Sequence, residues 1–330
     1  MKGAYRMFSH LKYAARSDVG RRRSNNEDSY GVFPESGMFC VADGMGGSDD
    51  GEVASAATIQ AVAHLAEGMK NLPDEAYPAG AVADSLSVAV DAASRWIYCR
   101  AQERKLNGCG STFVGVCFDP VNPGSAIALH AGDSRLYRFR DSELKQITRD
   151  HSAAELIGSS DEEINPLFRG MIMRAVGVHP KVEIERTSFS VAEGDRILIC
   201  SDGLTRMVLD GRIADILSDR RDANDAVHAL VDAANAAGGV DNITVVMVDV
   251  GALPPPRKAS QDVPPVQMQA EVFVDAFSTN PQTATMTDDG EDDAPCFAES
   301  PDGIDDGGPS PESGVLGRIV SGIFTRRKSR

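Results

Sequence analysis

The sequence has few basic residues for its length, and it lacks the long apolar runs that mark membrane proteins. It holds 33 Lys and Arg against 49 Asp and Glu, which gives a net charge of -16 and a pI near 4.8. An acidic surface does not attract the phosphate backbone of nucleic acids, so the charge argues against a generic nucleic-acid binder and is compatible with an acidic metal site. No segment approaches the roughly 20 apolar residues of a membrane span, and residues 1–18 hold no apolar core of signal-peptide length.

The six cysteines form no CxxC pair, so a zinc site or a redox motif of that kind is not expected. Cys40 and Cys200 lie inside apolar runs of strand character, where a thiol usually serves as a small core residue. This usage of cysteine predicts a reducing compartment, and therefore a cytoplasmic location.

The composition changes sharply near Gly251, where ALPPPRKASQDVPP opens a long polar tract. Residues 259–317 contain no Lys or Arg but 13 Asp or Glu, and Pro, Gly, Ser and Thr fill much of the rest. Such a composition cannot bury enough apolar surface to offset the entropy lost on ordering. We therefore predict a folded domain at residues 8–252 and an acidic, disordered linker at residues 253–314.

Within the predicted domain, strands and helices fall into separate runs, which favours an α+β fold. The pattern predicts a strand pair at 30–33 and 38–42, followed by alanine-rich helices at 52–68 and 81–104. Short strands at 111–119, 126–130, 134–140 and 144–148 suggest an antiparallel meander. Further strands are expected at 182–189, 196–200 and 243–250, with helices between 210 and 236. The polar, irregular segment 152–172 is predicted to be a mobile flap.

Four aspartates stand at the ends of predicted strands, each within two residues of a glycine: Asp43, Asp133, Asp202 and Asp241. A fifth acidic position, Glu27 with Asp28, follows three arginines in RRRSNNEDSY. A single aspartate after a strand is more often a turn former than a ligand, so the prediction rests on all five positions together. Carboxylates that converge repel one another unless a cation neutralises them. With no His or Cys at ligand spacing, such a cluster favours Mg²⁺ or Mn²⁺ over zinc.

These residues also carry a family resemblance. The segments RSDVGRRRSNNEDSYGV, VADGMGGSDDGEVAS, GSTFVGV, AGDSRLYRF, ITRDHS, MRAVG, ILICSDGL and GGVDNITVVMV follow one another between about residues 12 and 250. In this order they resemble the motif series of the metal-dependent PPM (type 2C) protein serine/threonine phosphatases, in their bacterial form. The resemblance implies a four-layer αββα sandwich, in which helices flank two antiparallel sheets, and a centre of two Mn²⁺ or Mg²⁺ ions.

The resemblance also implies a role for each matching residue. Asp43 would bridge the two metals, with Glu27 and the carbonyl of Gly44 on one ion and Asp202 and Asp241 on the other. Asp28 would bond metal-bound waters, and Asp133 would join Asp202 at the third, weaker metal that bacterial members often bind. Arg23, but not Arg21 or Arg22, matches the phosphate-binding arginine by its spacing to the Asn-Glu-Asp motif.

The implied reaction is hydrolysis of phosphoserine and phosphothreonine in proteins. A hydroxide bridging the metals attacks phosphorus in line, and no phosphoenzyme forms. The departing alkoxide needs a proton, and here the sequence departs from the family pattern. Relatives carry a histidine directly after the Asp-Gly pair or after the glycine cluster, whereas this chain has Met45 and Ser48. The alternative proton donors are a metal-bound water and His151, although a histidine beside a strand end is more often structural.

The C-terminal segment 315–330 spaces its apolar residues along one helical face and ends in a basic cluster. A peripheral anchor on an anionic membrane, a docking helix for a protein and a frayed tail are all compatible with it. The expected partners are phosphorylated proteins, namely a serine/threonine kinase and its targets. The rival function is a pseudophosphatase or regulatory binding module that acts through the tail, and the complete set of metal ligands argues against it.

Overall fold

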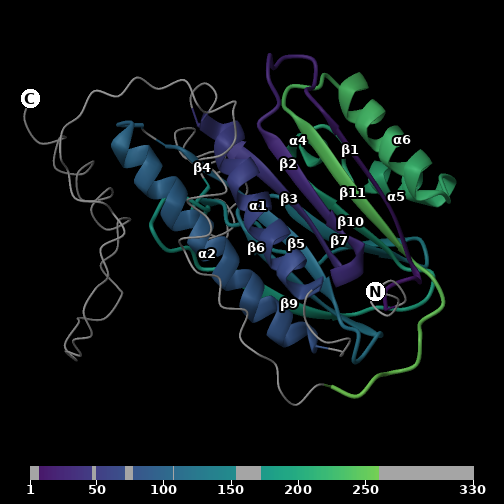
Figure 1. Cartoon of the computed structure of the whole chain (residues 1–330). Helices are drawn as coiled ribbons and strands as arrows, with labels where there is room; N and C mark the ends of the chain where they lie inside the picture. The colour runs from purple at the N-terminus through teal and green to yellow at the C-terminus, as the bar shows by residue number, and fades with distance from the viewer. Residues whose placement is uncertain (1–6, 47–49, 71–76, 107, 154–171, 260–330) are drawn as a thin grey trace, which may run out of the picture. The chain divides into compact units, whose positions relative to one another are not determined.

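Two antiparallel sheets lie face to face between two layers of helices in the computed structural model (Figure 1). The structure describes residues 7–46, 50–70, 77–106, 108–153 and 172–259. The chain divides into two units, residues 1–286 and 287–330, and every described residue belongs to the first. Most of the predicted linker, the segment 315–330 and residues 154–171 of the predicted flap lie outside the described residues. None of the helices in the described part combines the length and apolar character needed to cross a membrane.

The strands and helices follow one another much as the sequence predicts. In chain order they are β1 (Leu11–Asp18), β2 (Asp28–Phe33), the short helix η2 (Pro34–Ser36), β3 (Met38–Met45), α1 (Asp50–Lys70), α2 (Ala79–Glu103), β4 (Gly110–Ser111), β5 (Phe113–Phe118), β6 (Ser125–Ala131), β7 (Arg135–Arg140), β8 (Glu143–Gln146), β9 (Glu185–Ser190), β10 (Arg196–Cys200), α4 (Asp202–Thr205), α5 (Asp210–Asp219), α6 (Ala223–Ala236) and β11 (Ile243–Val250). The strand β1 was not predicted, because most of its side chains are half-buried or exposed and no apolar run marks it.

One sheet has the strand order β1-β11-β10-β7-β8, and the other has the order β2-β3-β5-β6-β9, with β4 paired to β3. The core has three layers, and the central strands are apolar throughout because both of their faces are buried. In β3, Cys40 faces α1 and α2, whereas Phe39 and Val41 face the other sheet. In β10, Leu198 faces the layer of α5 and α6, and Ile197 faces the opposite sheet. This alternation confirms the α+β, four-layer αββα arrangement.

Cys40 and Cys200 are fully buried free thiols in these layers, which agrees with their predicted place in the core. Burial raises the pKa of the Cys200 thiol to about 12, so the thiol stays protonated and unreactive at neutral pH. Both cysteines therefore act as packing residues.

The predicted meander is wrong at one connection. The strand β6 pairs with β5 and β9, whereas β7 pairs with β10 and β8 in the other sheet, so the chain changes sheets at residues 132–134. Gly132 makes this crossing with φ of +120°, a conformation that costs glycine little. A Cβ at this position would lie 2.7 Å from the Thr112 side chain. As a result, Asp133 stands between the two sheets.

Candidate metal centre

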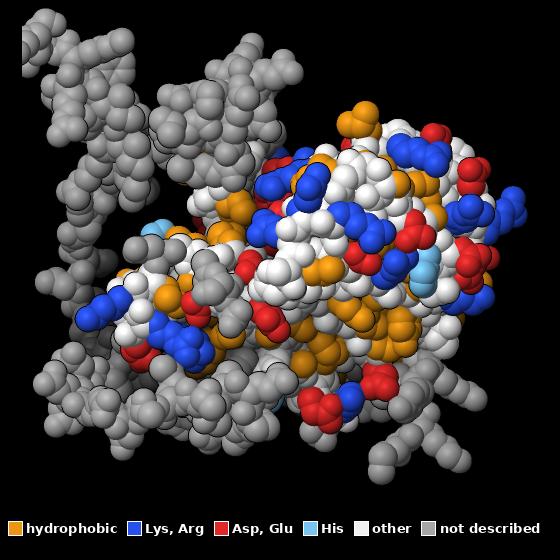
Figure 2. Space-filling view, turned by 90° about the horizontal axis from the view of Figure 1, so that it is seen from above, with side chains coloured by type: hydrophobic (Ala, Val, Ile, Leu, Met, Phe, Trp, Pro, Cys, Tyr) orange, Lys and Arg blue, Asp and Glu red, His pale blue; other side chains and the backbone are white. Residues whose placement is uncertain are grey.

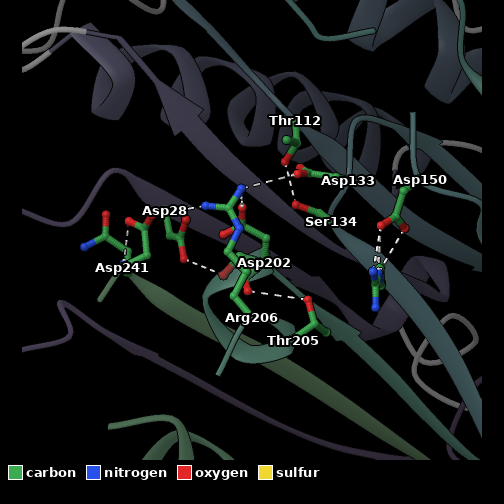
Figure 3. Close-up of polar contacts among 12 residues, drawn as sticks. Asp28, Thr112, Asp133, Ser134, Asp150, Asp202, Thr205, Arg206 and Asp241 are labelled. Atoms are coloured by element: carbon green, nitrogen blue, oxygen red, sulfur yellow. Dashed lines mark hydrogen bonds and ion pairs between the residues drawn. The ribbon is translucent and has the colours of Figure 1, made fainter. Parts of the chain in front are cut away.

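The predicted site residues meet at one end of the two sheets, because the strands that carry them end or begin there in register. Asp28 opens β2 and is the direct cross-strand partner of Asp43 near the end of β3. In the other sheet, Cys200 at the end of β10 pairs with Arg135, which opens β7. The residues that flank these strand ends are thereby brought to the same place (Figure 3): Asp133, Asp202 and Asp241.

Glu27 joins this group through the backbone of the glycine turn. The Gly44 N–H donates a hydrogen bond of 3.1 Å to the Glu27 carbonyl. A Cβ on Gly44 would lie 2.1 Å from the carbonyl oxygen of Gly51 and 2.6 Å from that of Glu27, so no larger residue fits there. We refer to the six converging acidic side chains as the carboxylate cluster: Glu27, Asp28, Asp43, Asp133, Asp202 and Asp241.

Burial makes the carboxylate cluster costly to ionise without a compensating charge. It raises the pKa of Asp28 to about 6, even though the Ser201 hydroxyl donates a hydrogen bond of 2.7 Å to this carboxylate. Burial, together with the neighbouring carboxylates of the cluster, raises the pKa of Asp202 to about 7 and that of Asp43 well above its usual range. Each of these carboxyl groups would ionise more readily beside a cation.

Several oxygens of the cluster are buried and have no hydrogen-bond partner among the described residues. They are Oδ1 of Asp28, of Asp133 and of Asp202, and each of the three residues is 8% exposed or less. Buried carboxylate oxygens in proteins are nearly always hydrogen-bonded or coordinated. Unpartnered oxygens in three different parts of the chain fit a site that a hard divalent cation and the waters bound to it would complete.

Three polar residues that the sequence did not single out hold the cluster in place. Asn242 accepts a hydrogen bond of 2.8 Å from the Glu27 N–H and donates to the carbonyls of residues 19 and 25. The Thr112 hydroxyl accepts a hydrogen bond of 3.0 Å from the Asp43 N–H. The Ser201 hydroxyl, besides its bond to Asp28, accepts one of 3.0 Å from the N–H of residue 244. Thr112 could have been noticed in the sequence, because it is a polar residue directly before the apolar run FVGV.

Two arginines pair with the cluster in the described part of the chain. Arg23 lies at the surface with its Nη2 2.9 Å from Oδ2 of Asp241, so the predicted phosphate-binding residue does reach the cluster. Arg206 was not singled out by the sequence. Its guanidinium lies 2.5 Å from Asp202 and 3.7 Å from Asp133. Figure 3 draws these ion pairs as dashed lines.

His151 takes no part in the cluster's hydrogen bonds. The residue is 8% exposed, and its Nδ1 accepts a hydrogen bond of 3.2 Å from the N–H of Gly132. Its Nε2 lies 3.0 Å from Oε2 of Glu185, and its ring stacks on His130 with 4.3 Å between the ring centroids. These contacts favour the structural interpretation of His151, as a residue that holds the turn before Asp133.

The three side chains His130, His151 and Glu185 also lie close enough together to hold a metal ion. However, Nη1 of Arg174 is 3.2 Å from Nε2 of His151, which places a positive charge at the position that an ion would need. The histidine-glutamate group therefore fits an internal hydrogen-bond network better than a metal site.

Comparison with known proteins places this geometry in context. The family model for protein phosphatase 2C matches residues 20–244. The chain is 40% identical over 247 residues to serine/threonine protein phosphatase PstP of Mycobacterium tuberculosis, a match that covers 73% of this chain and 45% of the relative. The chain thus spans less than half the length of that relative. It is 34% identical over 254 residues to the serine/threonine phosphatase stp of Listeria welshimeri, with 74% of this chain and 98% of the relative covered.

Among solved structures, the fold is similar to the crystal structure of the catalytic domain of PstP in complex with two manganese ions. The TM-score is 0.62 at 38% identity, and the match covers 73% of this chain and 98% of the other. The similarity therefore extends over nearly all of a domain that was crystallised with two manganese ions.

Proposed function

The chain belongs to the protein phosphatase 2C family, and from that premise we propose that it hydrolyses phosphoserine and phosphothreonine in proteins with the help of bound divalent cations. The observation that carries the proposal is the carboxylate cluster, in which three buried oxygens from different parts of the chain have no hydrogen-bond partner among the described residues. A fold similar to a domain that binds two manganese ions supports the same interpretation.

The carboxylate cluster supplies the ligands for two Mn²⁺ or Mg²⁺ ions in this proposal. Asp43 would hold both ions, Glu27 and the Gly44 carbonyl would hold one, and Asp202 and Asp241 would hold the other. The absence of space for a Cβ on Gly44 supports the use of its carbonyl, since the backbone there must stay close to Glu27. When bound, the two ions supply Lewis acidity toward the phosphate and activate a water molecule as the nucleophile.

Side chains of the protein would bind the phosphate group and orient the water molecule. Arg23 is half exposed beside Asp241, so its guanidinium can turn from the carboxylate to the phosphate group of an incoming substrate. Asp28 is held by the Ser201 hydroxyl and leaves Oδ1 unpartnered, which suits it to orient a water molecule by accepting a hydrogen bond from it. We propose Arg23 and Asp28 as the catalytic residues on these grounds.

The proton donor for the leaving group is not assigned to any residue in this proposal. Met45 has no ionisable proton, and Ser48 lies outside the described residues. A substrate with an acidic leaving group needs little protonation, whereas a serine or threonine alkoxide needs much more. We therefore expect a larger rate deficit on phosphoserine peptides than on p-nitrophenyl phosphate, compared with a relative that has the histidine.

The experiment is a phosphatase assay of the full chain with p-nitrophenyl phosphate and a phosphothreonine peptide, with and without Mn²⁺. We expect hydrolysis that depends on Mn²⁺, and a loss of at least about 100-fold in kcat/KM for Asp43→Asn. Asp215→Asn, an exposed aspartate on α5, is the matched control and is expected to keep full activity. Inactivity with every divalent metal tested, in a folded protein, would argue for a pseudophosphatase instead.

The physiological partners extend this proposal. We propose a serine/threonine kinase and its targets as the substrates, and a cytoplasmic location in which residues 315–330 contact the inner face of the membrane or a protein. Co-sedimentation with anionic liposomes, comparing the full chain with a chain that ends at Gly314, tests the membrane contact. Equal pelleting of the two chains would remove it.

A further inference from the structure

Arg206 extends its guanidinium across three carboxylates of the cluster, which come from three different parts of the chain. Nη2 lies 2.5 Å from Oδ2 of Asp202 and 3.7 Å from Oδ2 of Asp133, and Nη1 lies 3.9 Å from Oδ2 of Asp241 (Figure 3). The side chain is 46% exposed, so its inner face contacts the cluster while its outer face meets solvent.

The local backbone directs Arg206 to this position. It follows the short helix α4 directly, and its N–H donates a hydrogen bond of 2.8 Å to the carbonyl of Asp202, four residues earlier. Side chains four residues apart on a helix lie on the same face, and an acidic residue followed by a basic one in this spacing is the favourable order. The contact with Asp202 is therefore set by the sequence SDGLTR, and the fold then brings Asp133 within reach.

The charges of the site explain what this guanidinium does. Six ionised carboxylates carry six negative charges, and two divalent cations with Arg23 and Arg206 offset all six. Arg135, a third guanidinium near Asp133, is already bound to both carboxylate oxygens of Asp150. A third divalent cation on Asp133 and Asp202 would give the site an excess of positive charge. Both carboxylates assigned to this third ion already pair with the guanidinium of Arg206, whose like charge would repel it. The second ion of the proposed centre differs because it also has Asp43 as a ligand.

We propose that Arg206 takes the place of a third cation in this chain. Its guanidinium neutralises Asp133 and Asp202, so the site binds two divalent ions and disfavours a third. This inference rests on the proposed function, because it assumes that the carboxylate cluster is the metal centre. It also implies that Asp133 serves the reaction by holding Arg206 over Asp202, rather than as a metal ligand in its own right.

The test is a count of bound Mn²⁺, made by titrating the full chain and following the electron paramagnetic resonance signal of free Mn²⁺. We expect two Mn²⁺ per chain for the unmodified protein and three for Arg206→Ala, with the third ion bound at least tenfold more tightly than by the unmodified protein. The double variant Arg206→Ala with Asp133→Asn is expected to return to two. Arg206→Lys, which keeps the charge, should stay at two, as should the control Arg212→Ala on α5.

The possible results separate this inference from the proposed function. If the unmodified chain and Arg206→Ala bind the same number of Mn²⁺ ions with dissociation constants within twofold, Arg206 does not replace a cation. In that case, Mn²⁺-dependent hydrolysis by both chains would leave the proposed function intact. If neither chain binds Mn²⁺, the metal centre and this inference fail together. Arg206→Gln provides a second neutral variant of similar size, should Arg206→Ala lose its fold.

Discussion

Asp28 and Asp43 stand directly opposite one another in the antiparallel pair β2–β3, at the end of the sheet where the other acidic side chains arrive. Opposed carboxylates in a strand pair destabilise the fold. The register that creates this pair is fixed by the apolar residues behind it, because a slip of one residue would exchange the side chains of β3 that face the helices with those that face the other sheet. The core thus forces the two carboxylates together, and a bound cation can offset the cost.

The first prediction concerns pH and the metal-free protein. The pKa of Asp28 is raised to about 6 by burial, so between about pH 4 and pH 6 the folded chain keeps a proton that the unfolded chain has released. The free energy of unfolding must therefore fall as pH rises through this range. We expect Asp28→Asn to remove at most about 3 kcal/mol of that fall.

Urea unfolding in EDTA at pH 4.5 and pH 7.5 measures this effect. Asn at position 28 can still accept the hydrogen bond from Ser201, so the substitution changes charge more than packing. The control Asp215→Asn should follow the unmodified chain at both pH values. If the free energy of unfolding of the Asp28→Asn chain depends on pH as it does in the unmodified chain, the buried carboxyl of Asp28 is not the cause of that dependence.

A second prediction concerns the glycine turn. In Gly44→Ala the new Cβ would lie 2.1 Å from the Gly51 carbonyl oxygen, a contact that only a backbone shift can relieve. We expect a loss of roughly 2 to 4 kcal/mol in the free energy of unfolding together with weaker Mn²⁺ binding. Gly80→Ala, in α2, has open space around the new Cβ and should be neutral or slightly stabilising. Calorimetry of both variants, with and without Mn²⁺, measures these changes. Equal free energies of unfolding for Gly44→Ala and Gly80→Ala would contradict the crowding around Gly44.

A third prediction concerns Asn242, which supports the cluster without belonging to it. Asn242→Ala removes the acceptor of the Glu27 N–H and the donor to two carbonyls, leaving several buried groups unpaired. We expect a cost of roughly 2 to 4 kcal/mol and a dissociation constant for Mn²⁺ raised at least tenfold. Asn122→Ala, an exposed residue, is the control. Unchanged Mn²⁺ binding in a destabilised Asn242→Ala chain would show that Asn242 supports only the fold.

A fourth prediction separates the two interpretations of His151. Its hydrogen bond from Gly132 and its contact with Glu185 indicate a structural role, so His151→Ala should lose roughly 1 to 3 kcal/mol of stability. The shape of the pH profile of kcat/KM should not change. The exposed His228→Ala serves as the control. A stable His151→Ala chain that lost one limb of the pH profile would make His151 the general acid after all.

Much of the fold could be predicted from the sequence, because strands that are buried on both faces appear as continuous apolar runs. The strands β3, β10 and β11 were recognised for this reason. The edge strand β1 was missed because it is largely exposed or half-buried. The crossing at Gly132 was missed as well, since a glycine-aspartate turn between two short strands looks like a hairpin in sequence. Only the pairing of β6 and β7 with different partners reveals the change of sheet.

The candidate site, like the fold, could be predicted from the sequence only in part. The acidic members of the carboxylate cluster could be read from the sequence, since four stand at the ends of recognisable strands and the other two, Glu27 and Asp28, follow three arginines. The spacing of Arg206 to Asp202 was equally visible, but its contact with Asp133 depends on β6 and β7 lying in different sheets. Asn242 was visible only as part of the segment GGVDNITVVMV, because its partners lie more than 200 residues away in the chain.

Anomalous diffraction at the manganese edge, from crystals of the full chain grown with Mn²⁺, tests the metal centre most directly. We predict two peaks, both within coordination distance of Asp43, with Glu27 and the Gly44 carbonyl on one and Asp202 and Asp241 on the other. Peaks beside His130, His151 and Glu185, or no peak at the carboxylate cluster in a protein that hydrolyses phosphopeptides, would contradict the account.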